Sequence, residues 1–251
     1  MRSRTTIKIL SLLALCGIPG LILAQTTGLP SISLSVDSTT APAQLGTTIQ
    51  IVLLMTVLAL APSILVMTTA FTRIVVIFHF LRQAIGTQNT PSNQILISLA
   101  LFLTYFVMSP VFKEVNSNAL QPYLDDQIEQ EVALQNAVQP MKSFMLDHTR
   151  EKELELFASY FSETRPTSPE ALSMSIVIPA FMISELRVAF QIGFMLYLPM
   201  LLIDMVVAAV LMSMGMMMLP PVMISMPFKI LLFVLVDGWY LVVESIINGL
   251  R

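Results

Sequence analysis

Long apolar stretches alternate with shorter polar ones along this chain, and the pattern predicts two helical hairpins separated by a polar insert. Residues 46–112 are apolar apart from a turn at residues 86–93, and residues 171–251 are apolar again. An apolar stretch such as residues 47–70 is long enough, at 1.5 Å per residue, to cross a lipid core of about 30 Å. Internal prolines predict kinked helices, whose freed backbone groups need other helices or a water-filled cavity as partners.

The segment between the hairpins, residues 113–170, has a different character. It carries most of the charge of the chain, mainly acidic, and its apolar residues (Phe144, Leu154 and Phe157 among them) recur at helical spacing. The sequence therefore predicts a small amphipathic helical insert rather than a linker.

The N-terminus has the plan of a secretory signal peptide. Residues 1–24 begin with basic side chains, continue as an apolar run and end on Ala24, the expected last residue removed. The alternative is an uncleaved anchor helix. Residues 25–45 are rich in Ser, Thr, Pro and Gly, which predicts a disordered exported tail. A cleaved signal places the tail and the insert on the periplasmic side, and it places Arg73 and Arg82 toward the cytoplasm, as the positive-inside tendency requires.

Composition supports a membrane protein of the bacterial inner membrane. Hydrophobic residues make up 55% of the 251-residue chain and charged residues only 12%, whereas soluble domains carry about 25% charged residues. So little charge does not cover a globular surface, and the apolar excess must face lipid or other subunits. The net charge is −3 with no basic block, which argues against nucleic-acid binding.

Candidate catalytic chemistry is sparse. The chain has two histidines, His79 and His148, and its one cysteine, Cys16, lies inside the predicted signal peptide. HExxH, GxSxG and phosphate-loop motifs are missing from the sequence. We therefore expect no enzyme, no metal centre and no cofactor.

Charges embedded in the second apolar stretch are the first candidate functional residues. A charged side chain at the centre of a membrane helix costs about 2.5–3.5 kcal/mol on insertion scales, so each should face protein or water. Lys229 and Asp237 share a helix face but are too far apart to pair, so their partners must lie elsewhere. Pairing between subunits is the interpretation we favour, and pairing within the chain and an ion or proton pathway are the alternatives. The five residues are Glu185, Arg187, Asp204, Lys229 and Asp237.

Methionines crowd around Pro220 and Pro221, where a helix must break. Three of them, Met216, Met217 and Met218, are consecutive. A methionine stripe is usually soft core filling, but neighbours on a helix lie about 100° apart. Three in succession therefore cannot all face one core.

Three strings resemble the FliP family of flagellar type III export proteins: PAFMISELRVAFQIGF at 179–194, SMGMMMLPPVMISMPFK at 213–229 and VDGW at 236–239. The resemblance implies an all-α core subunit of the flagellar export gate, located in the inner membrane at the flagellar basal body. It further implies that several copies assemble with FliQ and FliR type partners into a helical complex. That complex would be closed at rest and would conduct unfolded flagellar subunits. Nothing in the tail or the insert carries a recognisable motif.

With the resemblance added, the candidate residues acquire roles. Met216, Met217 and Met218 are predicted to form the constriction of the conduit beside the break at Pro220 and Pro221. The embedded charges are predicted to hold subunits together. The competing hypothesis is a secondary transporter or ion channel with sites at Asp204, Lys229 and Asp237.

Overall fold

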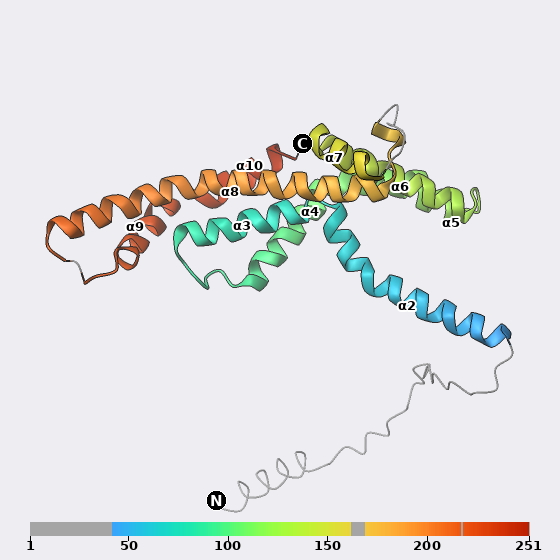
Figure 1. Ribbon diagram of the computed structural model, residues 1–251, viewed down its shortest axis with the longest axis horizontal. Coiled ribbons are helices and arrows are strands. Elements are labelled where there is room, and N and C mark those ends of the chain that lie inside the picture. Colours follow the sequence, from blue (N-terminus) through green and yellow to red (C-terminus); the bar gives the residue numbers. More distant parts are fainter. Residues whose placement is uncertain (1–41, 162–168, 217, 251) are drawn as a thin grey trace, which may run out of the picture. The chain divides into compact units, whose positions relative to one another are not determined.

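The computed structural model describes residues 42–161, 169–216 and 218–250, and every regular element within these ranges is a helix (Figure 1). The chain divides into two units, residues 1–53 and 54–251. In the first unit the described part is the beginning of α2 (Pro42–Thr68). The predicted signal peptide, with Ala24, lies outside the described residues. The helix begins at Pro42 rather than at the predicted residue 46, because proline suits the first turn of a helix.

The described part of the second unit contains the rest of α2 and ten further elements. In chain order these are α3 (Phe71–Ile85), α4 (Asn93–Val115), the π-helix η1 (Asn116–Leu120), α5 (Gln121–Leu124), α6 (Gln130–Asp147), α7 (Glu151–Phe161), the 3₁₀ turn η2 (Pro169–Ala171), α8 (Met174–Ser213), α9 (Pro221–Leu235) and α10 (Gly238–Asn248).

Helix α3 is the centre of the second unit, and it lies alongside α8 (Figure 1). Apolar residues recur along α3 at spacings of three and four, which gives a continuous face for packing. Ile74, Ile77 and Phe78 on this face are completely buried. The helix ends at Gly86, whose positive φ of 87° allows its N–H to bond the carbonyls of Arg82 and Gln83. The chain then turns and α4 packs back on α3.

Within the described ranges, three helices are long and apolar enough to cross a membrane, in α2, α4–α5 and α8. Helices α9 and α10, which are bent by 63° at their junction, would be a fourth if together they form one span. The predicted class, an all-helical protein with membrane-crossing helices, is confirmed at this level. The apolar windows of α2 and α8 are only 6% and 11% buried within the chain, so their surfaces are left for lipid or for other proteins.

Two helix breaks interrupt the apolar stretches. One lies between α9 and α10: α9 ends at Leu235, because Asp237 takes a left-handed conformation with φ of 52°. The other separates α2, which ends at Thr68, from α3. At that break the hydroxyls of Thr68 and Thr69 donate to carbonyls one turn earlier, at 2.9 and 2.8 Å, and so they provide partners for backbone near the break.

The predicted helical insert contains α6 and α7, which pack on the N-terminal part of α8. Met145 and Leu154 are buried in this contact. The ammonium of Lys142 donates to the carbonyl of Glu170 at 2.6 Å, which fixes the described end of the insert near α6. The insert is therefore a folded part of the second unit.

Close packing of α3 on α8 depends on Gly193. A β-carbon at this position would lie 2.6 Å from ring carbons of Phe80, and Phe80 also contacts the ring of Phe190. Gly193→Ala should therefore destabilise the chain by about 1–3 kcal/mol through overpacking. Thermal unfolding in detergent measures the change. Adding Phe80→Leu to Gly193→Ala makes room and should recover part of the loss; no recovery would show that the ring is not the obstacle.

Candidate functional site

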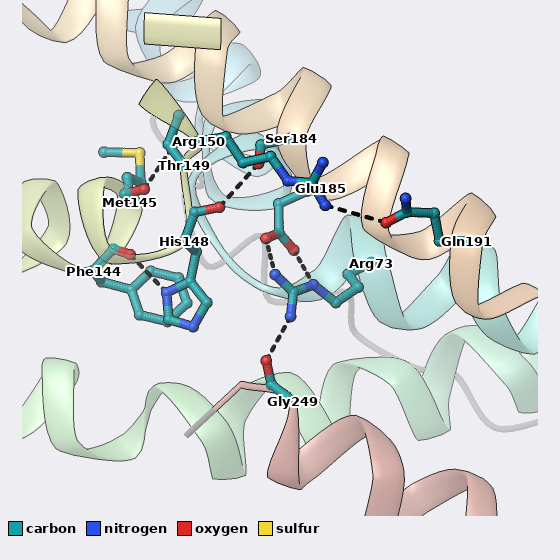
Figure 2. Close-up of polar contacts among 10 residues, drawn as sticks. All are labelled: Arg73, Phe144, Met145, His148, Thr149, Arg150, Ser184, Glu185, Gln191 and Gly249. Atoms are coloured by element: carbon teal, nitrogen blue, oxygen red, sulfur yellow. Dashed lines mark hydrogen bonds and ion pairs between the residues drawn. The ribbon is translucent and has the colours of Figure 1, made fainter. Parts of the chain in front are cut away.

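Among the ion pairs of the described residues, the most deeply buried joins Arg73 of α3 to Glu185 of α8 (Figure 2). Nε of Arg73 donates to Oε2 of Glu185 at 2.7 Å, and Nη2 donates to Oε1. The third guanidinium nitrogen, Nη1, donates to the carbonyl of Gly249 at 2.9 Å. One guanidinium therefore holds together α3, α8 and the chain just after α10.

Both partners of this contact are withdrawn from water, since the side chains of Arg73 and Glu185 are 5% and 0% exposed. The planar fork of arginine matches a carboxylate in two parallel hydrogen bonds, which makes the pair directional. The insert approaches the same place: Ser184 donates to the carbonyl of His148 at 3.1 Å (Figure 2). The contact thus lies where both hairpins and the insert meet.

A second contact joins Arg187 of α8 to Glu153 of α7, with Nη1 and Oε1 3.1 Å apart. The arginine side chain is 48% exposed, whereas the glutamate is 7% exposed. Within the described residues Oε2 of Glu153 has no hydrogen-bond partner. This half-exposed pair joins the insert to α8. It uses Nη1 of Arg187, and the other guanidinium nitrogens make no hydrogen bond to Glu153.

The third contact joins α9 to α8 near the methionine-rich turn. Nζ of Lys229 donates to Oδ2 of Asp204 at 2.6 Å, and the hydroxyl of Ser225 donates to Oδ1. Ser225 and Lys229 are four residues apart and therefore share one face of α9. Both oxygens of the Asp204 carboxylate are thus bonded by one turn of the neighbouring helix.

Four of the five embedded charges therefore have partners inside the chain. Lys229 does not pair with Asp237, as the sequence indicated, and its partner is Asp204. Arg73, which the sequence places toward the cytoplasm, is buried in the first turn of α3. Its role could not be read from sequence, because its partner is 112 residues away. The predicted role of these charges between subunits stays a prediction.

Removing the ammonium of Lys229 should loosen the second hairpin. Lys229→Ala leaves Asp204 with Ser225 alone, and an uncompensated, partly buried carboxylate typically costs about 2–3 kcal/mol. The exposure of α9 to limited proteolysis should rise accordingly. Lys229→Ala combined with Asp204→Ala removes both charges and should be less damaging than the single variant; an additive effect would contradict a direct pair.

The methionine-rich turn connects α8 to α9 and is the other candidate site. Met216 is 45% exposed and Met218 is 98% exposed, while Met217 lies outside the described residues. Gly215 has a positive φ of 76°, which ends the helical course beyond Ser213. Pro220 is extended and Pro221 opens α9. The two described methionines of the run are therefore not core filling within this chain.

Metal-ligating side chains do not gather in the described part of the chain, where no three of His, Cys, Asp and Glu lie together as a metal site would require. His148 bonds the carbonyl of Phe144 at 2.8 Å, and His79 lies 3.3 Å from Nη2 of Arg82. Both histidines thus have local partners. The chemistry that the described residues do support is ion pairing and deformable apolar contact.

These features define a helical membrane protein. Buried ion pairs fix the packing of its helices, and much of the apolar surface of its long helices is not covered by its own chain. The model of the FliP family matches residues 54–246, and the chain belongs to this family.

Relatives match nearly the whole chain. The flagellar biosynthetic protein FliP of Bacillus subtilis is 53% identical over 216 residues, which cover 86% of this chain and 98% of the relative. FliP of Aquifex aeolicus is 45% identical over 251 residues, 99% of each chain. FliP of Caulobacter vibrioides is also 45% identical over 251 residues, covering 100% of this chain and 92% of the relative.

Family membership confirms the resemblance inferred from three short strings. FliP proteins are flagellar biosynthetic proteins of the export apparatus and not enzymes. The expectation that this chain is not an enzyme is therefore confirmed by its family.

Proposed function

We propose that this chain is a core subunit of the flagellar type III export gate. Several copies assemble with FliQ and FliR type membrane proteins around a conduit, closed at rest, for unfolded flagellar subunits. The complex lies in the bacterial inner membrane at the flagellar basal body, with the insert, residues 113–170, on the periplasmic side. Family membership supports the export role, and the surface of the helices supports the assembly.

The length and exposure of α8 support assembly with other subunits. Its 40 residues extend about 60 Å, roughly twice the thickness of a lipid core. The helix is apolar along its length, yet its apolar window is only 11% buried within the chain. Part of α8 packs on α3, α6, α7 and α9, and the surface of its apolar window is left for lipid or for other protein. Because lipid spans only about half of the helix, the length of α8 supports contact with further subunits of a membrane complex.

In this proposal the methionine turn is the gate. Met216, Met217 and Met218 from each copy form the constriction, and the break at Pro220 and Pro221 lets them project from the end of the hairpin. The unbranched thioether side chain repacks easily, so a ring of methionines seals against water and deforms around varied polypeptide. The exposure of Met216 and Met218 supports this role, since neither is used by the core of its own chain.

The embedded charges support assembly by fixing the shape of each subunit. Glu185, Arg187, Asp204 and Lys229 join helices within the chain, and the faces that neighbouring subunits meet depend on how those helices pack. Loss of one partner therefore disrupts assembly through the subunit as well as through any contact across an interface. Among the described residues Asp237 forms no such ion pair.

The competing function is a secondary transporter or ion channel with sites at Asp204, Lys229 and Asp237. Both oxygens of Asp204 are already bonded to Ser225 and Lys229, which leaves little capacity for a passing ion. Purified chain in liposomes separates the two functions. A gate subunit is expected to be inert alone, whereas a transporter should show substrate- or ion-dependent flux that Asp204→Asn abolishes.

The predicted signal peptide gives an independent test of the exported topology. Cleavage after Ala24 should remove residues 1–24 because the basic, apolar and small-residue regions succeed one another in the required order. Intact-mass measurement of the purified protein should find a chain beginning at Gln25. A mature chain that retains Met1 would instead indicate an anchor helix.

A further inference from the structure

The second hairpin continues beyond the level at which the first hairpin turns back. Helix α3 ends beside α9, since a β-carbon on Gly86 would lie 3.8 Å from Cγ of Met226, and α4 packs back on α3. The neighbouring Ser225 bonds Asp204, which marks the same level on α8. Helix α8 continues for about 14 Å past Asp204 before it ends, at 1.5 Å per residue. Residues 205–224 therefore form a hairpin tip that contains the methionine turn.

The hairpin tip offers few constraints on its own orientation. It carries no charged residue. Large apolar side chains of both its helices are between 52% and 64% exposed: Met205, Val206, Val210, Met212, Val222 and Met223. Apolar contact is not directional, so it does not by itself fix the angle at which the tip leaves the rest of the subunit. That angle must be fixed at the base of the tip.

A polar clasp, formed by Asp204, Ser225 and Lys229, lies at this base. Nζ of Lys229 donates to Oδ2 of Asp204 at 2.6 Å, and the Ser225 hydroxyl donates to Oδ1. Ser225 is fully buried and the side chain of Lys229 is 4% exposed, so water competes little with these bonds. Among the described residues, they are the side-chain hydrogen bonds that join α8 to α9. Because two donors one turn apart hold both oxygens of one carboxylate, the clasp fixes the rotation of α9 as well as its distance from α8.

We propose that this clasp positions the methionine turn so that the conduit stays closed. The inference rests on the proposed function, in which Met216 and Met218 belong to the constriction. The turn connects the two helices that the clasp joins, and a small rotation at the base is enlarged along the length of the tip. Methionine side chains repack to follow small displacements, but they cannot seal when the whole turn points elsewhere. The clasp residues are thus positioning residues, and the methionines remain the seal.

A reversible clasp tests this role in the assembled complex. The variant carries Asp204→Cys and Ser225→Cys, with Lys229→Met so that no ammonium is stranded and Cys16→Ser so that the chain has no other cysteine. The two short side chains are in contact, which puts their α-carbons in the range of a disulfide, about 7 Å. With the disulfide reduced, small-ion conductance per complex in liposomes should exceed that of the parent at least about tenfold, because the closed arrangement has lost its clasp. Oxidation should return the conductance to the parent level.

Two serine variants provide a matched comparison. Ser225→Ala removes one hydroxyl from the clasp and leaves the ion pair, so the complex should assemble and leak. Ser213→Ala removes a hydroxyl of the same tip that bonds only the carbonyl of Val210 on its own helix, at 2.7 Å, and should stay tight. A reduced cysteine variant that is as ion-tight as the parent overturns the inference. If that variant does not assemble or does not form the disulfide, the serine pair decides: more conductance from Ser225→Ala supports the inference, and equal conductance overturns it.

The glycine variant of residues 216–218 separates this inference from the function on which it rests. If the glycine variant leaks and the reduced clasp variant does not, the gate lies at the methionine turn and only the positioning role is wrong. If neither variant leaks, the gate lies elsewhere and both proposals are overturned.

Discussion

Glu185→Ala is expected to prevent accumulation of assembled protein and to abolish motility. The substitution removes the carboxylate that accepts hydrogen bonds from two nitrogens of Arg73. The Arg73 guanidinium, only 5% exposed, is then left without that partner. Stranding one partner of a buried pair typically costs about 3–5 kcal/mol, which is a large part of the stability of an ordinary domain. The amount of assembled complex recovered in mild detergent, with swimming in soft agar, measures the effect.

Two variants show whether burial is the reason. Arg187→Ala combined with Glu153→Gln removes a pair whose arginine is 48% exposed without leaving a charge on the buried glutamate, and its cost within the subunit should be roughly 1 kcal/mol. Arg73→Met with Glu185→Leu replaces both buried charges by apolar groups and should recover folding beyond either single variant. Equal damage from the Arg187→Ala, Glu153→Gln pair and from Glu185→Ala to the folding of the purified subunit would contradict the account.

Replacing Met216, Met217 and Met218 together by glycine is expected to give an assembled but leaky complex. Glycine removes the side chains proposed to seal the conduit, and the turn outside the helices tolerates the change in backbone freedom. Small-ion conductance across the membrane should rise, while export of flagellar subunits is retained or only reduced. Conductance of cells or liposomes containing the complex is the measurement.

The matched controls change the turn without removing the seal. Leu219→Gly adds glycine beside the run and should stay ion-tight. The triple change to leucine keeps apolar bulk but stiffens the side chains, so the complex should stay closed and export should slow. If the glycine variant assembled and remained as tight as the parent, the methionines would be packing residues and the gate would lie elsewhere.

The helical class followed from sequence because hydropathy is local. Apolar stretches of more than twenty residues predict membrane helices by themselves, and the insert was marked by its charge. The break at Asp237 could not be predicted from sequence, because neither aspartate nor glycine is a strong signal inside an apolar run. It depends on the Phe233 ring against Gly238, which is visible only in the fold.

The ion pairs could not be assigned from sequence because their partners are distant along the chain. The embedded charges were recognisable in sequence because a charged residue in an apolar stretch is energetically costly. That cost implies that each charge has a partner, but it does not identify the partner. Arg73 attracted attention in sequence only through its positive charge, and tertiary packing pairs it with Glu185. The methionine run was found from its spacing, since three consecutive residues cannot face one core.

Imaging the complex purified in mild detergent tests the central claim most directly. The account predicts particles containing several copies of this chain together with FliQ and FliR type proteins, around an axis closed by density from residues 216–218. Particles with one copy, no partner proteins and no central axis would contradict an export-gate subunit.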